Sequence, residues 1–229
     1  MWQILSHDYD TQSSFYAVKK ACEPIHVQLD LSNYEVDVVN TTIAPLSGLL
    51  VSADVYTLDS KRVAHMEGHK DIAADAESTG MKLDLTSFLQ TAMVLVKLEL
   101  HDAQGKLLSD NVYWLGAESS SYRELNRLHA ATLAGTASST QTGDTVHIHV
   151  QLRNTSNVPA LADKLTLLNA GDGARILPAY LSDNYVSLLA GETRDIEIEY
   201  PATAGKGSPQ LAVRGWNLTP FTIAVTPTK

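Results

Sequence analysis

The chain has 229 residues, of which 44% are hydrophobic and 19% charged, as is usual for a globular protein with one large domain or two ordinary ones. The net charge of -9 and the scattered basic residues argue against nucleic acid as a partner, because phosphate binding needs clustered Lys and Arg. No apolar run is long enough for a membrane span, and Cys22, the single cysteine, excludes an intrachain disulfide and a thiolate metal cluster.

The first 22 residues differ in pattern from the rest of the chain. The stretch "DYDTQSSFYAVKKACEP" predicts a helix that Pro24 prevents from continuing. Three residues define its apolar face: Phe15, Val18 and Cys22. Three residues before the helix resemble a buried strand: Trp2, Ile4 and Leu5. We expect this strand and helix to lack a packing partner within the chain.

From residue 24 the sequence alternates with period two, which is the signature of strands. Seven such segments precede residue 117 and predict an immunoglobulin-like β-sandwich over residues 24–117. The segment "DAQGK" predicts a glycine-containing hairpin loop between the last two strands. Residues 118–135 predict a linker with a short helix capped by Ser119 to Ser121, followed by a Gly, Ser and Thr tail that reads as loop.

A second set of alternating segments predicts another immunoglobulin-like sandwich over residues 136–229. The two sets share a short echo, "NTTIAP" from Asn40 and "NTSNVP" from Asn154, in which each asparagine precedes a proline by five positions. We interpret both as turn chemistry at corresponding corners. The same reading applies to Asn217, although all three asparagines also fit the glycosylation pattern. Trp114 and Trp216 lie in alternating segments and are expected in the core.

Two pairs of histidines have spacings that can serve a metal. His147 and His149 share one face of a predicted strand, but no third ligand is indicated nearby, so exposed positions are the better reading. His65 and His69 occur in "HMEGH", which lacks the helical HExxH arrangement. We therefore expect no metal and no cofactor.

The segment from Asp183 to Tyr185 holds the best candidates for a functional site. In one reading, Asp183 and Asn184 fix a loop by bonding the backbone, and Tyr185 covers an edge of the core. In the other, this loop contacts a sugar or a further domain. Trp2 has the same two readings. The segment that follows, "LLAGE", predicts a turn at Gly191 that leads into a strand with Ile196 and Ile198 directed inward.

Three phrases resemble family-two glycoside hydrolases of the exo-glucosaminidase and β-mannosidase kind. "FYAVKKACEPIHVQ" is similar to the junction between the last barrel helix and an immunoglobulin-like domain, and "SDNVYWL" to that domain's closing strand. "RILPAYLSDNYVSLLAGETRDIEIE" and "VRGWN" resemble the final domain, with Ala190 where the family phrase has proline. The resemblance implies that residues 1–23 are a remnant of the last barrel strand and helix.

Glycosidic cleavage in such enzymes is implied to need two carboxylates on a (β/α)8 barrel of on the order of 250 residues. This chain is too short for a barrel and two sandwiches, so we expect no catalytic residue in it. The main hypothesis is a non-catalytic region that braces the barrel of a periplasmic or secreted enzyme. The alternative is a stand-alone carbohydrate-binding or adhesion module. Residues 1–22 could also form a homodimer interface through their apolar face.

Overall fold

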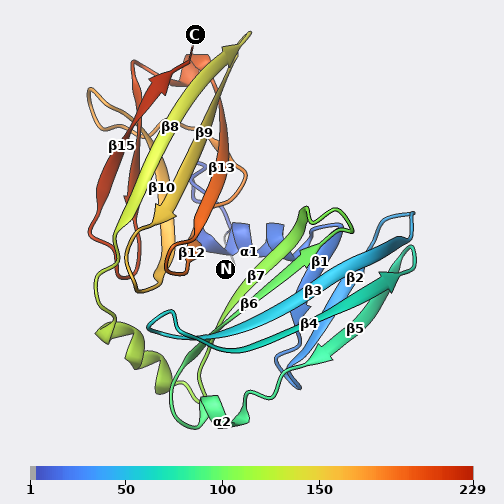
Figure 1. Ribbon diagram of the computed structural model, residues 1–229. Coiled ribbons are helices and arrows are strands. Elements are labelled where there is room, and N and C mark those ends of the chain that lie inside the picture. Colours follow the sequence, from blue (N-terminus) through green and yellow to red (C-terminus); the bar gives the residue numbers. More distant parts are fainter. Residues whose placement is uncertain (1–3, 229) are drawn as a thin grey trace. The chain divides into compact units, whose positions relative to one another are not determined.

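The computed structural model describes residues 4–228, and its regular structure is almost entirely β-strand (Figure 1). The chain forms two compact units, which we call the middle unit (residues 19–128) and the C-terminal unit (residues 4–18 and 129–228). Each unit has its own hydrophobic core. The prediction of an all-β protein with immunoglobulin-like sandwiches is therefore confirmed. No helix in the described part of the chain combines the length and hydropathy required to cross a bilayer.

The middle unit is a sandwich of a three-stranded and a four-stranded sheet, in the orders β1-β2-β5 and β4-β3-β6-β7. Its strands are β1 (Ile25–Leu29), β2 (Glu35–Asn40), β3 (Leu46–Thr57), β4 (Arg62–Ile72), β5 (Ala76–Lys82), β6 (Val94–His101) and β7 (Leu107–Leu115). Alternate residues of β3 and β6 fill the space between the sheets, as the period-two pattern predicted, and Val51 and Leu98 are fully buried. A short helix, α2 (Thr86–Leu89), precedes β6.

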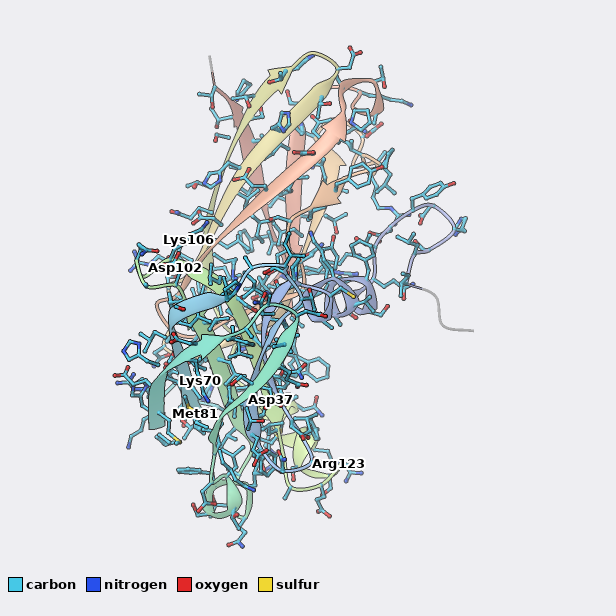
Figure 2. All side chains as sticks on the ribbon, turned by 90° about the vertical axis from the view of Figure 1, so that its right-hand side faces the viewer. Asp37, Lys70, Met81, Asp102, Lys106 and Arg123 are labelled. Atoms are coloured by element: carbon cyan, nitrogen blue, oxygen red, sulfur yellow. The ribbon has the colours of Figure 1, made fainter. Side chains whose placement is uncertain are left out.

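The loop between β6 and β7 has the predicted hairpin geometry. The Asp102 N–H donates to the Lys106 carbonyl at 2.9 Å, and Gly105 adopts a φ of 81° that suits glycine. The Asp102 side chain also accepts hydrogen bonds from the Gln104 and Lys106 N–H groups, each at 2.9 Å. Figure 2 shows Asp102 and Lys106 close together at this turn.

The segment after β7 forms a 3-10 helix, η1 (Ser121–Arg127), that is anchored to the middle unit. The Tyr122 hydroxyl donates to the Trp114 carbonyl at 3.0 Å, and a carboxylate oxygen of Glu124 accepts the Met93 N–H at 3.3 Å. Leu125 is its buried residue. The predicted serine cap is wrong, because Ser120 at the N-terminal boundary makes no capping hydrogen bond through its side chain.

The C-terminal unit holds eight strands in the order β11-β13-β9-β8-β15-β14-β10-β12. They are β8 (Leu133–Thr142), β9 (Thr145–Asn154), β10 (Ala160–Asn169), β11 (Tyr180–Leu181), β12 (Val186–Leu188), β13 (Thr193–Pro201), β14 (Pro209–Arg214) and β15 (Phe221–Pro227). A 3-10 turn, η2 (Ala202–Ala204), follows β13. The parallel pairing of β15 with β8 connects the two halves of this sheet. Ile196 and Ile198 are fully buried in its core, as predicted, and Ile148 is fully buried beside them.

Strand β8 corrects the loop predicted for the Gly, Ser and Thr tail. It pairs with β9 over ten residues, and Figure 1 shows the two strands side by side. Only Leu133 and Ala137 of β8 are buried, and alanine is small. The alternation of apolar and polar residues that marks a strand is therefore weak in this segment. A Cβ on Gly135 would lie 2.2 Å from Ile223 Cδ1, which explains the glycine within this strand. Pairing with β9 on one edge and with β15 on the other therefore stabilises a strand whose own sequence only weakly favours β structure.

The two predicted corners have the same hydrogen-bond pattern. Asn40 Nδ2 donates to the Ala44 and Ala73 carbonyls at 2.9 Å, and its Oδ1 accepts the N–H and hydroxyl of Thr42. Asn154 Nδ2 likewise donates to carbonyls of Val158 and Leu188 at 2.8 and 2.9 Å. Its Oδ1 accepts the N–H and hydroxyl of the residue two positions on, Ser156. Both asparagines are fully buried, so the interpretation as turn chemistry is confirmed.

The tryptophans differ from their predicted positions. Trp216 follows β14 in a bend and is 54% exposed, so its prediction as a core residue is wrong. Trp114 lies in β7 as expected but faces away from the core and is only half-buried. Alternation in "VRGWN" ends at Arg214 because the chain turns at Gly215, and this turn removes Trp216 from the strand.

Candidate functional site

The leader, which we define as residues 4–18, packs against the core of the C-terminal unit through an aromatic side chain. Tyr16 on α1 (Ser13–Ala21) is 6% exposed and belongs to that core. The half-buried ring of Phe15 meets the Tyr16 ring edge to face at a centroid distance of 5.1 Å. The hydroxyl groups of Tyr16 and Thr11 are 2.9 Å apart. The expectation that this segment lacks a packing partner is therefore wrong for its aromatic residues.

The predicted apolar face of the leader is also corrected. Val18 is 51% exposed and Cys22 is exposed, since α1 turns Tyr16 toward the core instead. Ile4 and Leu5 are partly exposed and do not form the expected buried strand, because Leu5 makes only an isolated bridge to Thr11. Trp2 lies outside the described residues.

A set of ion pairs, which we call the leader clamp, fixes the leader to the C-terminal unit. Lys164 Nζ on β10 lies 2.9 Å from Asp10 Oδ2, and Arg175 bonds Asp8 and, at 3.1 Å, Asp10. Lys164 is buried. Burial, the largest single cause, would lower its pKa, but the interactions with Asp10 and Tyr185 together outweigh burial and raise the pKa, so the ammonium stays charged.

The pKa of Asp8 is lowered to about 2, first by the hydroxyl of Ser6 at 2.5 Å and further by the Asp10 N–H and by Arg175. Asp8 is thus an anion across the physiological pH range and has no proton to donate. A catalytic acid for glycoside cleavage needs the opposite shift. The two carboxylates of the leader clamp therefore serve as anionic partners for Lys164 and Arg175.

The predicted site residues Asp183 and Asn184 lie in a loop clamped to β10. Asn184 is buried, its Oδ1 accepts the Leu165 N–H at 2.7 Å, and its Nδ2 donates to the Leu165 carbonyl at 3.0 Å. Asp183 Oδ1 accepts the Asn184 N–H at 2.8 Å. These bonds replace strand pairing at a point where the chain leaves the sheet.

Tyr185 joins this loop to the leader. Its φ of 56° is unusual for a residue with a side chain, and its N–H donates to Asn184 Oδ1 at 2.9 Å. Its ring lies 6.1 Å from the Tyr16 ring and 5.4 Å from Lys164 Nζ, a cation–π distance. The loop from Asp183 to Tyr185 and the leader thus form one site, in which Tyr185 contacts both the helix and the clamp.

Sequence reasoning missed Lys164, Arg175 and Asp10 as members of this site. One signal was available: Lys164 is a charged residue inside the apolar segment "LADKLTLLN", where a buried cation requires a partner. The sequence gives no indication that this partner is Asp10, which precedes Lys164 by 154 positions.

A second feature of β10 is Asp163, which is completely buried, with neither carboxylate oxygen bonded within the described residues. Burial raises its pKa to about 7. A Cβ added to Gly215 would lie 2.0 Å from Asp163 Oδ1, so the carboxylate rests directly on the glycine backbone. Nearby, the Trp216 N–H donates to the Leu161 carbonyl at 2.8 Å. The "GWN" phrase is therefore a turn that closes over Asp163.

The histidines of β9 lie on its outward face beside the acids of β13. His149 is 2.7 Å from Glu197 and 3.4 Å from Asp195, and His147 is 3.3 Å from Glu199. Their outward positions agree with the sequence interpretation. Between residues 4 and 228, no group of three or more His, Cys, Asp and Glu residues has a geometry suited to a metal ion.

These features describe a β-sandwich protein whose polar residues fix loops and a leader. A model of the exo-β-D-glucosaminidase Ig-fold domain matches residues 111–218. The exo-β-D-glucosaminidase of Amycolatopsis orientalis is 31% identical over 94% of this chain and 23% of its own length. The mannosylglycoprotein endo-β-mannosidase of Lilium longiflorum is 27% identical over 94% of this chain and 29% of its own length.

The crystal structure of A. orientalis exo-chitosanase CsxA superposes with a TM-score of 0.90 at 29% identity, covering 97% of this chain and 29% of that one. The chain therefore spans about a quarter of the length of the relatives it matches. The fold and these matches together define immunoglobulin-like sandwiches similar to those of glycoside hydrolases. Residues 111–218 match the model of the exo-β-D-glucosaminidase Ig-fold domain, and the resemblance to this kind of enzyme seen in the sequence is confirmed.

Proposed function

We propose that this chain is the non-catalytic C-terminal region of a glycoside hydrolase acting on β-linked glucosamine or mannose sugars, and that it braces the catalytic barrel. The proposal rests mainly on the alignment of nearly the whole chain with about a quarter of exo-β-D-glucosaminidase relatives. The parent enzyme's catalytic carboxylates would lie outside the aligned quarter.

The chemistry of the described acids supports this assignment. Asp8 and Asp10 both pair with Arg175, and the pKa of Asp8 is lowered to about 2, first by the Ser6 hydroxyl, so Asp8 has no proton to donate. Asp163 has the raised pKa of a general acid, yet it is sealed from any sugar and burial is the sole cause of its shift, so no second carboxylate acts on it. Neither arrangement supplies the accessible acid and nucleophile that retaining cleavage needs.

The leader supplies a surface for the bracing role. Tyr16 and the leader clamp fix it to the C-terminal unit, while Ile4, Leu5 and Val18 remain partly exposed. Apolar side chains held on a fixed segment are suited to packing against a further domain. In this proposal they contact the barrel, and Tyr185 positions the leader for that contact.

Hydrolysis of para-nitrophenyl β-D-glucosaminide and the corresponding β-mannoside tests the catalytic part of the proposal. We expect the purified chain to release nitrophenol at the rate of a buffer blank, with a full-length exo-β-D-glucosaminidase as the positive control. Turnover by the chain that survives repurification would show that catalytic residues lie within it.

A carbohydrate-binding module is the alternative function, favoured by exposed aromatic side chains on the C-terminal unit. Tyr180 is 66% exposed and Trp216 is 54% exposed, and such rings can stack on sugars. Calorimetric titration with glucosamine oligomers, in parallel with Trp216→Ala and Tyr180→Ala, distinguishes the two functions. A saturable heat of binding that either substitution abolishes would support the carbohydrate-binding module. A titration without a heat of binding would support the bracing role.

A further inference from the structure

The carboxylate of Asp163 lies in a buried position where no hydrogen bond within residues 4–228 would stabilise its ionised form. It sits at an irregularity of β10, where the register with β12 shifts between Ala160 and Asp163, and the intervening Ala162 has a φ of 52°. Both of its oxygens lack hydrogen bonds within residues 4–228, and the side chain is 0% exposed. An isolated charge in such surroundings is costly, so the site favours the neutral acid.

The segment 215–218, which we call the glycine turn, closes this site. Gly215 leaves no room for a side chain above Oδ1, since a Cβ there would also lie 3.1 Å from the Leu161 carbonyl. Asn217 fixes the turn by donating to the His129 and Pro159 carbonyls at 2.9 and 2.8 Å and by accepting the Leu161 N–H at 3.1 Å. The glycine turn therefore lies directly over Asp163 Oδ1, and its withdrawal would give water access to the carboxylate.

The charged groups on neighbouring elements leave Asp163 uncompensated. Lys164 follows it on β10, but its ammonium bonds Asp10. Arg214 on β14 is exposed, opposite Lys164 in the register. Asp183 and Tyr185 precede β12. The Asp183 carboxylate accepts a hydrogen bond from the Asn184 N–H. Burial is the one cause of the shifted titration of Asp163.

We propose that Asp163 and the glycine turn form a proton-controlled latch, in which the neutral acid keeps the turn closed and loss of its proton to solvent opens it. The ionised carboxylate gains hydration only when Gly215 withdraws, and Trp216, which belongs to the turn, moves with it. Acidic conditions hold the latch closed, alkaline conditions open it, and the two states are about equally populated near pH 7.

The direction of the pH effect follows from linkage. The folded-state pKa of Asp163 is about 7 and its ordinary value 3.8, so between these pH values the folded state binds more protons than the unfolded state. The contribution of Asp163 to the free energy of unfolding is therefore greatest below about pH 4, falls as the pH rises toward 7, and is constant above pH 7. The unfolding equilibrium constant increases up to about tenfold per pH unit within that window.

The test uses the intact chain labelled with 15N. Between pH 5 and 9 we expect the Gly215 amide and the Trp216 indole resonances to titrate together with a midpoint near pH 7. In Asp163→Asn this titration should disappear, whereas in Asp144→Asn, which changes an exposed aspartate of the same unit, it should remain. Urea unfolding of the same proteins should show the wild type losing stability relative to Asp163→Asn as pH rises to 7.

Two results would overturn the latch. One is wild-type Gly215 and Trp216 resonances that do not move between pH 5 and 9, a measurement that requires no variant to fold. The other is a titration near pH 7 that persists unchanged in Asp163→Asn, which would assign it to another group.

Discussion

Asn40 and Asn154 show how a single residue type determines the corner of each sandwich. Each asparagine is fully buried and uses its amide to satisfy two carbonyl groups from separate segments, while its oxygen accepts two donors from the residue two positions later. No other uncharged side chain of this size offers two donors and an acceptor at once. Since the bonds occupy the whole amide, the corners leave no free amide nitrogen at these glycosylation patterns in the folded protein.

Replacing Asn154 by alanine tests the corner. The Val158 and Leu188 carbonyls would lose the amide donor of Asn154, although Val158 keeps the Ser156 hydroxyl at 3.2 Å, and a buried polar group that loses its partner costs about 1–3 kcal/mol. We expect Asn154→Ala to lower the free energy of unfolding by about 2–5 kcal/mol in urea titrations. Asn157→Ala, at an exposed position of the same turn, should change it by less than about 0.5 kcal/mol. Equal effects of the two substitutions would contradict this account.

At the scale of elements, the leader is a structural part of the C-terminal unit although residues 19–128 separate them in sequence. One buried aromatic ring, the ion pairs of Lys164 and Arg175, and the ring of Tyr185 hold it. A short helix such as α1 is marginal in isolation, so its stability depends on this packing. The loop from Asp183 to Tyr185 therefore matters to the leader as much as to its own sheet.

Substitution of Tyr16 should release the leader. Tyr16→Ala removes a large buried ring, and we expect trypsin to cleave after the exposed Lys19 at least tenfold faster in native conditions, because local opening precedes cleavage. Tyr9→Ala is the matched control, since Tyr9 belongs to the same leader but is exposed. Unchanged cleavage in Tyr16→Ala would mean that the clamp alone holds the leader.

The pH dependence of the leader clamp is opposite in sign to that of Asp163. The pKa of Asp8 is depressed to about 2, so its contribution is present above its ordinary value of 3.8 and is lost only as pH falls through about 2. Hydrogen exchange of residues 4–18, corrected for intrinsic rates, should show undiminished protection from pH 7 to 4. Loss of protection already at pH 5 would show that another group controls the clamp.

At the scale of the whole molecule, each unit has a separate core cluster. Leu98 belongs to one and Leu165 to the other, and both are buried. A unit with its own core is expected to unfold cooperatively by itself. Neither sandwich is therefore expected to need the other for its stability.

Paired core substitutions check this independence. Leu98→Ala and Leu165→Ala should each destabilise by about 2–5 kcal/mol, because each leaves a cavity. With residue-resolved NMR during urea titration, Leu98→Ala should shift only the transition of residues 19–128, and Leu165→Ala only that of the C-terminal unit. A common shift of all resonances by either substitution would show that the chain unfolds as one body.

Local sequence patterns were enough to predict the β class, the inward residues of the long strands and the two asparagine corners, and three phrases carried the family resemblance. These follow from local rules: alternation reports burial on a pleated strand, and Asn, Gly and Pro report turns. Tertiary structure alone decided that β8 is a strand, that Trp216 lies outside the core, and that Tyr16 docks on the C-terminal unit. Each of these depends on partners far away in the chain, such as Asp10 for Lys164 or β9 for β8, and their pairing energies have no local pattern in the sequence.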